Sequence, residues 1–280
     1  MRRHEVGITA VGRDRGGVIA AFTNAVFESG GNIERMSQNV IKGLFGMHIR
    51  ASFPRGVDAG ALDAAVGRIG AETGMDVDTH HETGRPKNVA VFVTREPGCL
   101  EAILGARRTL GGRVALIVGT DGALRPLARR HGIPFVLAGG RDQQASERKM
   151  LAACKKADIG LIALARYMRI LTPNFVWRYP ERIINIHPSL LPAFPGALAY
   201  EQAHERGAKV AGVTAHYVTE SLDQGPIILQ EPFKVDPGDT LEQVKGRGQR
   251  LEARVLLRAV RLHLAGRLDV RWRRVHVRGR

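Results

Sequence analysis

An asparagine and a histidine lie two positions apart at the end of an apolar run, in the stretch RIINIHPSLLP. Side chains alternate along a β-strand, so Asn185 and His187 would project from the same face. Pro188 has no N–H for a sheet ladder and would end the strand there. Two hydrogen-bonding groups that meet at a strand end, before a loop, are typical of a functional site. A satisfied core asparagine followed by a loop histidine would give the same pattern.

A carboxylate follows in the loop ESLDQGP, where Asp223 stands beside a glycine and a proline. Taken alone, an aspartate in such a loop is usually a turn residue. Its position about 36 residues after His187, in the same order as a known pair of motifs, favours a functional role. The combined string NIHPSLLPAFPGA … VTAHYVTESLDQGPIILQE resembles the folate-dependent formyltransferase superfamily, and the resemblance covers roughly residues 88–265. It implies that Asn185, His187 and Asp223 form that superfamily's catalytic triad.

The chemistry of formyl groups suits these residue types. Transfer or hydrolysis of a formyl group passes through a tetrahedral carbon that bears an oxyanion, so hydrogen-bond donors must point at that oxygen. The Asn185 amide and a protonated His187 can supply them. A nearby carboxylate such as Asp223 would keep the imidazole cationic, and it can also orient or deprotonate a water. No metal is required, and His187, His204 and His216 lack ligand spacing with cysteine or carboxylate, so no metal site is expected.

A folate substrate also needs a pocket for its flat pterin ring. The stretch LARYMRILTPNF resembles the superfamily's pterin-binding loop, although an ordinary apolar patch capping the core would look the same. The anionic glutamate tail of folate would give some of the excess positive charge a purpose. The resemblance implies two sets of substrate-binding residues, which are Met168, Arg169, Ile170 and Leu171 on one side and Val218, Thr219 and Glu220 on the other.

The stretch VTREPGCLEAI at 93–103 separates groups within the superfamily. Glycinamide ribonucleotide transformylases carry a phosphate-binding loop of the form G-x-G-S-N in that place, and here one glycine and no Ser-Asn pair are present. The stretch resembles formyltetrahydrofolate deformylases instead. Methionyl-tRNA formyltransferases resemble the chain least, since they carry a further C-terminal domain. Deformylases often have a second histidine where this chain has Pro188, so water and an amine both stay open as formyl acceptors.

The elements that must position these residues follow a simple alternation. Short apolar stretches such as 113–119, 158–165 and 182–187 are separated by segments with helical periodicity. This pattern predicts an α/β fold, with a mostly parallel, Rossmann-like sheet in a formyltransferase-type domain at 89–280. Ligands of such sheets bind beyond the carboxyl ends of the strands. A long amphipathic helix follows, and Asp239 with Glu242 resembles its capping box.

Residues 1–82 predict a separate α+β sandwich, in the order strand, helix, strand, strand, helix, strand, with a hairpin turn at Lys42-Gly43. The stretch GRDRGGVIAAFTNAVFESGGNIERMSQ resembles an ACT domain, a small-ligand regulatory module, and the polar segment 83–88 is predicted to be a linker. ACT domains often bind an amino acid in the turn after their first strand, at a subunit interface. The resemblance implies effector binding by Asp14, Gly16 and Gly17, and a plain helix N-terminus is the alternative.

Charge and composition narrow the class of partner. The chain of 280 residues has 42 Lys and Arg against 27 Asp and Glu, a formal net charge of +15. No zinc-finger spacing, RNP motif or basic heptad accompanies the scattered basic residues, so an anionic substrate is expected and nucleic acid is not. No apolar run is long enough for a membrane span and no secretory signal is visible. Cys99 and Cys154 match no disulfide framework, so a reducing cytoplasm is the expected location.

The resemblance as a whole implies hydrolysis of 10-formyltetrahydrofolate to tetrahydrofolate and formate, with the folate as substrate and no cofactor. The formate would supply one-carbon and purine metabolism. A formyltransferase acting on an amine acceptor and a non-catalytic folate or amino-acid sensor are the alternatives, and the intact triad argues against the sensor. A homo-oligomer is also expected, because the small N-terminal unit has little core of its own.

Overall fold

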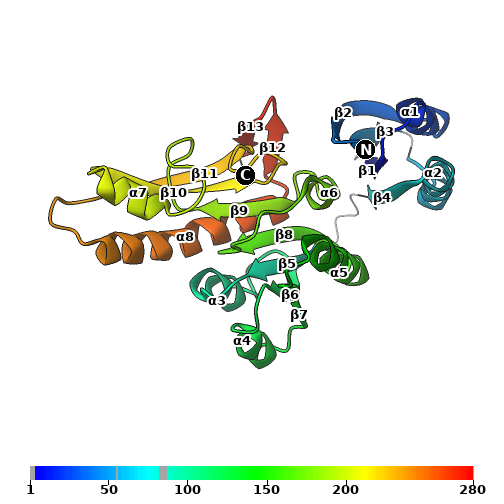
Figure 1. The fold of residues 1–280 in the computed structure, drawn as a ribbon. Coiled ribbons are helices and arrows are strands. Elements are labelled where there is room, and N and C mark those ends of the chain that lie inside the picture. The colour runs from blue at the N-terminus through cyan, green and yellow to red at the C-terminus, as the bar shows by residue number, and fades with distance from the viewer. Residues whose placement is uncertain (1–3, 55, 82–86, 280) are drawn as a thin grey trace. The chain divides into compact units, whose positions relative to one another are not determined.

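The computed structural model describes residues 4–54, 56–81 and 87–279, and the chain falls into two compact units (Figure 1). The first unit comprises Met1–Arg85 together with Thr172–Pro180, and the second comprises Pro86–Leu171 and Glu181–Arg280. The predicted linker at 83–88 lies mostly outside the described residues. Its last residue, Asn88, already belongs to a strand. No helix in the described part of the chain is long and apolar enough to cross a membrane.

The first unit is the ACT-like sandwich that the sequence predicts. Its four-stranded sheet has the order β2-β3-β1-β4, every neighbouring pair is antiparallel, and the core includes Phe22, Ile49 and Phe53. Lys42 and Gly43 both have positive φ, at 50° and 78°, which is the backbone that a tight hairpin between β2 and β3 requires. The elements are β1 (His4–Arg13), α1 (Val18–Glu28), β2 (Asn32–Ile41), β3 (Leu44–Phe53), α2 (Ala59–Thr73) and β4 (Met75–His81).

A short segment from the middle of the chain completes the first unit. It contains α6 (Pro173–Val176). A Cβ built on Gly46 of β3 would lie 2.3 Å from Trp177 Cε3, so the indole ring packs directly on the backbone of β3. Arg178 Nη1 forms an ion pair with Asp76 Oδ2 of β4 at 2.5 Å. The sequence offers no sign of this association, because 172–180 is flanked by elements of the second unit.

The second unit contains a seven-stranded sheet with the order β11-β10-β9-β8-β5-β6-β7. The five strands from β9 to β7 run parallel, as predicted, and β10 and β11 are antiparallel to their neighbours. All residues of β8 are buried, as expected for a strand covered on both faces. The strands are β5 (Asn88–Val93), β6 (Arg113–Gly119), β7 (Phe135–Leu137), β8 (Ile159–Ala165), β9 (Ile183–His187), β10 (Val210–Tyr217) and β11 (Ile227–Lys234).

Helices cover this sheet, and the longest of them begins with a different capping box from the one predicted. The helices are α3 (Gly98–Gly105), α4 (Arg125–Arg130), α5 (Gln143–Lys156), α7 (Ala199–Glu205) and α8 (Leu241–Leu264), and α8 contacts β9, β10 and β11. The predicted capping box of Asp239 and Glu242 is wrong by one residue: Thr240 and Gln243 form it. The Asp239 carboxylate instead accepts a hydrogen bond from the Asp236 N–H and pairs with Arg247, so it stabilises the turn before the helix.

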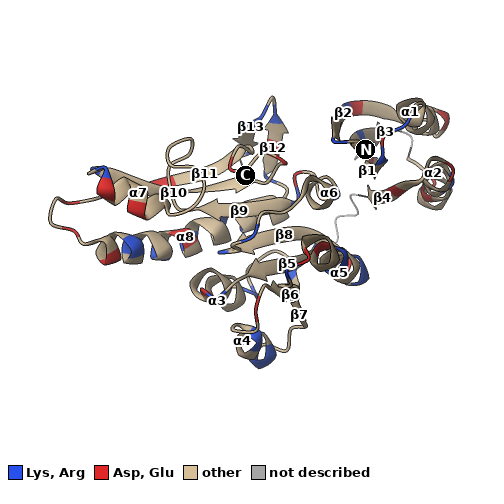
Figure 2. Cartoon of the chain, viewed as in Figure 1, with Lys and Arg blue, Asp and Glu red and all other residues tan. Residues whose placement is uncertain are grey.

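The basic C-terminal segment forms a hairpin that is not among the elements predicted from the sequence. Its strands are β12 (Leu268–Arg271) and β13 (Arg274–Val277). Val270 is buried in the core of the second unit, whereas Trp272 at the turn is 96% exposed. Asp269 forms ion pairs with two arginines of the segment, Arg271 and Arg278. Figure 2 marks the positions of the acidic and basic residues along the ribbon of each unit.

Candidate active site

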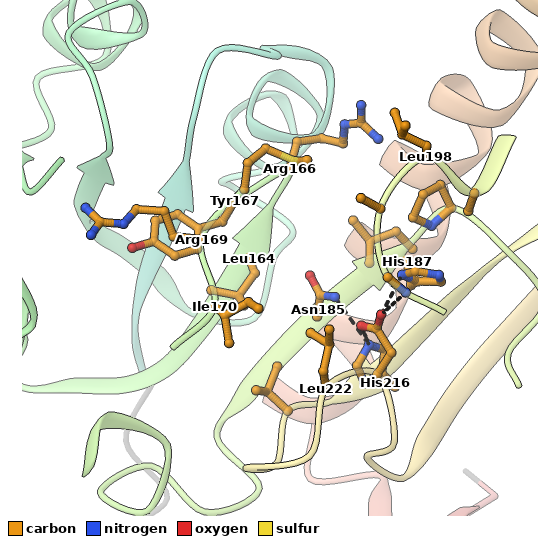
Figure 3. A pocket seen from close by; sticks show the side chains of 18 of the residues that line it. Leu164, Arg166, Tyr167, Arg169, Ile170, Asn185, His187, Leu198, His216 and Leu222 are labelled. Atoms are coloured by element: carbon orange, nitrogen blue, oxygen red, sulfur yellow. Dashed lines mark hydrogen bonds and ion pairs between the residues drawn. The ribbon is translucent and has the colours of Figure 1, made fainter. Parts of the chain in front are cut away.

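The loops after β8 and β9 border a cavity of about 490 Å3 (Figure 3). The chain runs outward from β5 through β6 to β7 on one side, and from β8 to β9 on the other. The order of strands therefore reverses between β5 and β8, and ligands of doubly wound sheets bind at such a reversal, beyond the carboxyl ends of the strands. The fold thus places the cavity where an α/β sheet ordinarily binds its substrate.

The three residues predicted to form the triad meet in this cavity. Asn185 and His187 point from the same face of β9, and Asp223 comes from the loop between β10 and β11. Asp223 Oδ2 lies 3.4 Å from His187 Nδ1 and accepts a hydrogen bond of 2.8 Å from the Gly196 N–H. The His187 and Asp223 side chains are only 4% and 6% exposed. Burial strengthens their interaction, because little water screens the charges.

The Asp223 loop has a tightly constrained backbone. Asp223 itself has φ of 54°, a left-handed conformation that aspartate tolerates better than most residues do. A Cβ on Gly225 would lie 1.7 Å from the Tyr217 carbonyl oxygen, so only glycine fits there. The Tyr217 N–H donates to the Pro226 carbonyl at 2.9 Å and closes the base of the loop. These contacts hold the carboxylate facing the histidine.

The surroundings of His187 suit the protonated ring. Its Nε2 lies 2.9 Å from the Phe194 carbonyl oxygen, which only accepts hydrogen bonds, so that nitrogen must carry a proton. Its Nδ1 faces the Asp223 carboxylate, which also favours a proton. A ring protonated on both nitrogens satisfies the two acceptors at once. The geometry thus offers one hydrogen-bond acceptor to each ring nitrogen, and the imidazolium–carboxylate pair stays a prediction.

A second histidine, His216 of β10, belongs to the same cluster and is not among the site residues predicted from the sequence. His216 Nε2 lies 3.2 Å from Asn185 Nδ2 and 3.8 Å from Asp223 Oδ1. Burial lowers the pKa of His216, which favours the neutral ring; the Tyr217 carbonyl and Asp223 oppose that shift less strongly. Alternation along β10 could have signalled the residue, since Thr214 and His216 interrupt an apolar strand on one face.

The residues expected to hold the pterin line one end of the cavity. Met168 and Ile170 are 65% and 67% exposed, which is unusual for large apolar side chains and leaves them available to a flat ring. The Arg169 guanidinium points away and donates to the Gly140 carbonyl. The Met168 N–H donates to Thr94 Oγ1 at 3.0 Å, so the loop after β5 supports this segment. All seven proposed residues line the cavity: Met168, Arg169, Ile170, Leu171, Val218, Thr219 and Glu220.

A buried acidic group lies behind Arg166 and Tyr200, two residues that line the cavity. Glu252 of α8 is fully buried, and the Tyr200 hydroxyl donates to its Oε1 at 2.7 Å. Arg166, which follows β8, reaches its Oε2 at 3.5 Å. Burial raises the pKa of the Glu252 carboxyl, and Arg166 and Tyr200 partly offset the shift. Burial also raises the pKa of the nearby Cys99 thiol to about 12, so this thiol is not a nucleophile at neutral pH.

The predicted effector residues lie in the first unit, between β1 and α1. The Asp14 N–H donates to the Gly43 carbonyl at 2.9 Å, and Gly17 precedes the helix with φ of 85°. A Cβ on Gly16 or Gly17 would meet no atom within 4 Å. The turn is therefore open, and α1 has no side-chain cap at its start. No group of three or more His, Cys, Asp and Glu side chains that could hold a metal is found in either unit's described residues.

Comparisons with known proteins agree with this architecture. The ACT domain family matches residues 4–80 and the formyl transferase family matches residues 87–260. The formyltetrahydrofolate deformylase of Bacillus subtilis is 38% identical, with 92% of this chain and 88% of the relative covered, and that of Synechocystis is 36% identical, with 92% of both covered.

Solved structures of formyltetrahydrofolate deformylases and glycinamide ribonucleotide transformylases are also similar to this chain. A formyltetrahydrofolate deformylase from Pseudomonas syringae pv. tomato superposes with a TM-score of 0.69 at 31% identity, covering 100% of this chain and 95% of that one. Glycinamide ribonucleotide transformylase 1 from Symbiobacterium toebii superposes with a TM-score of 0.66 at 37% identity, covering 70% and 96%. The chain therefore belongs to the formyl transferase family, with an ACT domain at residues 4–80, and over most of its length it is similar to proteins named formyltetrahydrofolate deformylase.

Proposed function

We propose that this protein hydrolyses 10-formyltetrahydrofolate to tetrahydrofolate and formate. The observation that supports this most directly is the buried cluster of Asn185, His187 and Asp223 in the cavity of a chain whose relatives over nine tenths of its length are named deformylases. The reaction would supply formate to one-carbon and purine metabolism. The folate is the substrate, and the proposed chemistry uses side chains and water alone, without a cofactor.

The proposed mechanism assigns one task to each residue. With the pterin held against 168–171, the formyl oxygen lies toward the Asn185 amide, which stabilises the oxyanion together with His187. Asp223 accepts a proton from the attacking water. Addition of the water oxygen to the formyl carbon gives the tetrahedral oxyanion. The C–N bond then breaks with its electron pair going to nitrogen, which takes a proton from His187, and the proton held by Asp223 replaces it. His187 must exchange its contact with Phe194 or Asp223 for one to the substrate when it donates.

Formyl transfer to an amine is the alternative reaction, since transformylases are also structural neighbours. The turn after β5 argues against it. Pro97 stands at the N-cap of α3, and Thr94 supports the Met168 segment, in the place where a phosphate-binding loop was expected for a transformylase. The turn therefore lacks the run of small residues whose free N–H groups would cradle a phosphate.

One assay separates the two reactions. Purified protein is incubated with 10-formyltetrahydrofolate and no amine acceptor, and formate is measured with a coupled dehydrogenase. Stoichiometric formate in wild-type protein, and none above background in Asp223→Asn, is the expected result. Formyl turnover that requires an added amine would refute hydrolysis, and absence of any turnover with retained folate binding would favour the sensor.

We also propose that the ACT-like unit regulates the enzyme and contributes to a homo-oligomer. Support comes from the open turn at Asp14, Gly16 and Gly17, and from the exposed edge strand β2, which carries Met36 and Val40 at 43% and 40% exposure. An amino acid is the proposed effector, because its carboxylate could bind N–H groups at the start of α1. Cys99 and Cys154 are buried and neither forms a disulfide, in keeping with a proposed cytoplasmic location.

A further inference from the structure

The backbone at Arg166 is strained. Arg166 follows the last residue of β8 and has φ of 59°, in the left-handed region that long side chains rarely adopt. Glycine would take this conformation without strain, so the sequence retains an arginine at a cost in backbone energy. Such strain persists where the surroundings impose it, and it concentrates at functional sites. In this case the side chain enters the active-site cavity.

Of the basic residues that line the cavity in the described ranges, Arg166 has the weakest contacts to other protein groups. The Lys and Arg residues that line the cavity within the described ranges are Arg166, Arg169 and Lys245. Arg169 donates to backbone carbonyls outside the cavity, and Lys245 forms an ion pair of 2.6 Å with Glu201. Arg166 makes one long contact, at 3.5 Å to Glu252, and its buried Nε has no hydrogen-bond partner among the described residues. Its planar fork therefore keeps donors for a ligand.

Glu252 does not explain Arg166 by itself. The Tyr200 hydroxyl satisfies Oε1 of Glu252 at 2.7 Å, and this approach is possible only because residue 248 is glycine: a Cβ there would lie 2.1 Å from the hydroxyl oxygen. An arginine kept only to neutralise Glu252 would be expected to form short, paired hydrogen bonds. The observed contact is longer than that. Glu252 instead acts as a support that holds the guanidinium at the cavity wall.

We propose that Arg166 binds the carboxylate of formate as hydrolysis releases it. The inference rests on the proposed function and names the residue that receives its small product. Water oxygen bonds to the formyl carbon, the C–N bond breaks with its electron pair going to nitrogen, and nitrogen takes one of the two water protons. The second proton is released, so the small product is an anion with two equivalent oxygens. A guanidinium fork matches that geometry with two parallel N–H···O bonds.

Product inhibition tests the proposal. Initial rates are measured with increasing sodium formate, against sodium chloride at equal ionic strength, because salt alone screens charges. In Arg166→Gln we expect the inhibition constant for formate to rise about tenfold or more, as for loss of a charge-assisted pair. Arg254→Gln is the matched control: it removes the same charge from an exposed arginine of α8 that pairs with Glu231, and its inhibition constant should equal the wild-type value.

The glutamate tail of folate offers a second carboxylate, and a truncated substrate separates the two sources. If Arg166 bound the tail, Arg166→Gln would raise KM for 10-formyltetrahydrofolate but not for 10-formyltetrahydropteroate, which lacks the glutamate. That outcome overturns the proposal. We expect KM to change by the same small factor for both substrates, and formate inhibition to weaken with both.

A further variant guards against a folding defect. Arg166→Gln leaves Glu252 buried without its cation, which can destabilise the fold. The double variant Arg166→Gln/Glu252→Gln removes both charges, and Glu252→Gln alone keeps Arg166. We expect the double variant to show the weakened formate inhibition, and the single Glu252→Gln variant, which keeps the Arg166 charge but loses its support, to show a smaller effect. Equal formate inhibition in wild type and the double variant overturns the proposal.

The same experiments distinguish this inference from the proposed function. If the wild-type protein releases no formate without an acceptor, hydrolysis itself fails. If it releases formate, but formate inhibits it no more than chloride does, hydrolysis stands and the role of Arg166 fails.

Discussion

Asn185 and His216 are direct partners in the antiparallel register of β9 and β10, and Asn185 Nδ2 lies 3.2 Å from His216 Nε2. The Nδ1 of His216 faces the Tyr217 carbonyl at 2.9 Å and must carry the proton of a neutral ring. Nε2 is then an acceptor, and it receives one N–H of the Asn185 amide. The second N–H of that amide is left for the formyl oxygen. His216 thus orients the donor that stabilises the oxyanion.

The lowered pKa of His216 predicts a pH dependence of stability. Burial disfavours the charged ring in the folded state, so below the usual pKa of 6.5 the unfolded chain binds a proton that the folded chain does not. The free energy of unfolding should therefore fall as pH drops below this value, with no contribution from His216 above it. His216→Gln should show a shallower loss between about pH 6.5 and 5 in thermal unfolding. Parallel curves for both proteins would contradict this.

Asp223→Asn tests the carboxylate. Asparagine also tolerates the left-handed backbone at this position, so the loop should keep its conformation. We expect folate affinity to persist in a binding titration, while kcat falls at least about a hundredfold, as for loss of a group in acid–base catalysis. Asp236→Asn, in an exposed turn after β11, is the control and should keep full activity. Near-wild-type turnover in Asp223→Asn would remove the role assigned to this residue.

Gly225→Ala tests the loop that carries Asp223. The added Cβ would overlap the Tyr217 carbonyl, so the loop must shift and the contact of Asp223 with His187 must lengthen. We expect destabilisation of about 1–3 kcal/mol, as for overpacking, together with a large loss of kcat. Gly238→Ala is the matched control, because a Cβ there meets no atom within 4 Å. Chemical denaturation and steady-state rates measure both; full activity in Gly225→Ala would show that the loop can relax.

The acceptor can be tested with glycinamide ribonucleotide. Because the turn at 94–97 lacks a phosphate cradle, we expect this compound neither to bind nor to accept the formyl group. Product analysis by mass spectrometry, with formate measured in the same sample, gives the answer. Formylated ribonucleotide in amounts comparable to the tetrahydrofolate formed would identify a transferase.

The edge strand β2 predicts where subunits pair. Lysine on an edge strand opposes strand addition, so Val40→Lys should weaken a homo-oligomer joined at β2. Phe27→Lys makes a similar change on α1, where the side chain is 79% exposed and off the edge, and it should leave assembly unchanged. Light scattering at micromolar concentration compares the two variants with wild type. A wild-type monomer at that concentration would exclude the proposed oligomer.

Local patterns in the sequence predict much of this site. Alternation in β9 places Asn185 and His187 on one face, and the Gly-Pro loop presents Asp223, because both depend on neighbours along the chain. His216 and Arg166 depend on longer relationships. Alternation along β10 marks His216 as a polar group on an apolar strand, but its role depends on the antiparallel register with β9 that pairs it with Asn185. Arg166 becomes significant only when its left-handed backbone and the distant Glu252 are known.

Two other differences between the predicted and the observed structure also result from contacts that the local sequence does not show. The capping box moves from Asp239 to Thr240 because Asp239 is drawn to Arg247, a contact one helical turn beyond any cap pattern. The hairpin of β12 and β13 is difficult to recognise in the sequence, because the segment is rich in arginine and resembles a charged tail. The core contact of Val270 decides its structure.

The packing of Trp177 on Gly46 also limits how the ACT-like unit can be exchanged by recombination. Thr172–Pro180 is encoded far from the rest of the first unit, yet a single methyl group at Gly46 would collide with the indole ring. A recombination event near residue 85 that exchanged one ACT-like module for another would carry Gly46 and Asp76 but leave Trp177 and Arg178 behind. A foreign ACT-like module would then pack against Trp177 only if its third strand also had a glycine at the position of Gly46. The two coding segments are thus expected to change together, and chimeras made by a single crossover should fail more often than double-crossover chimeras that also exchange 172–180.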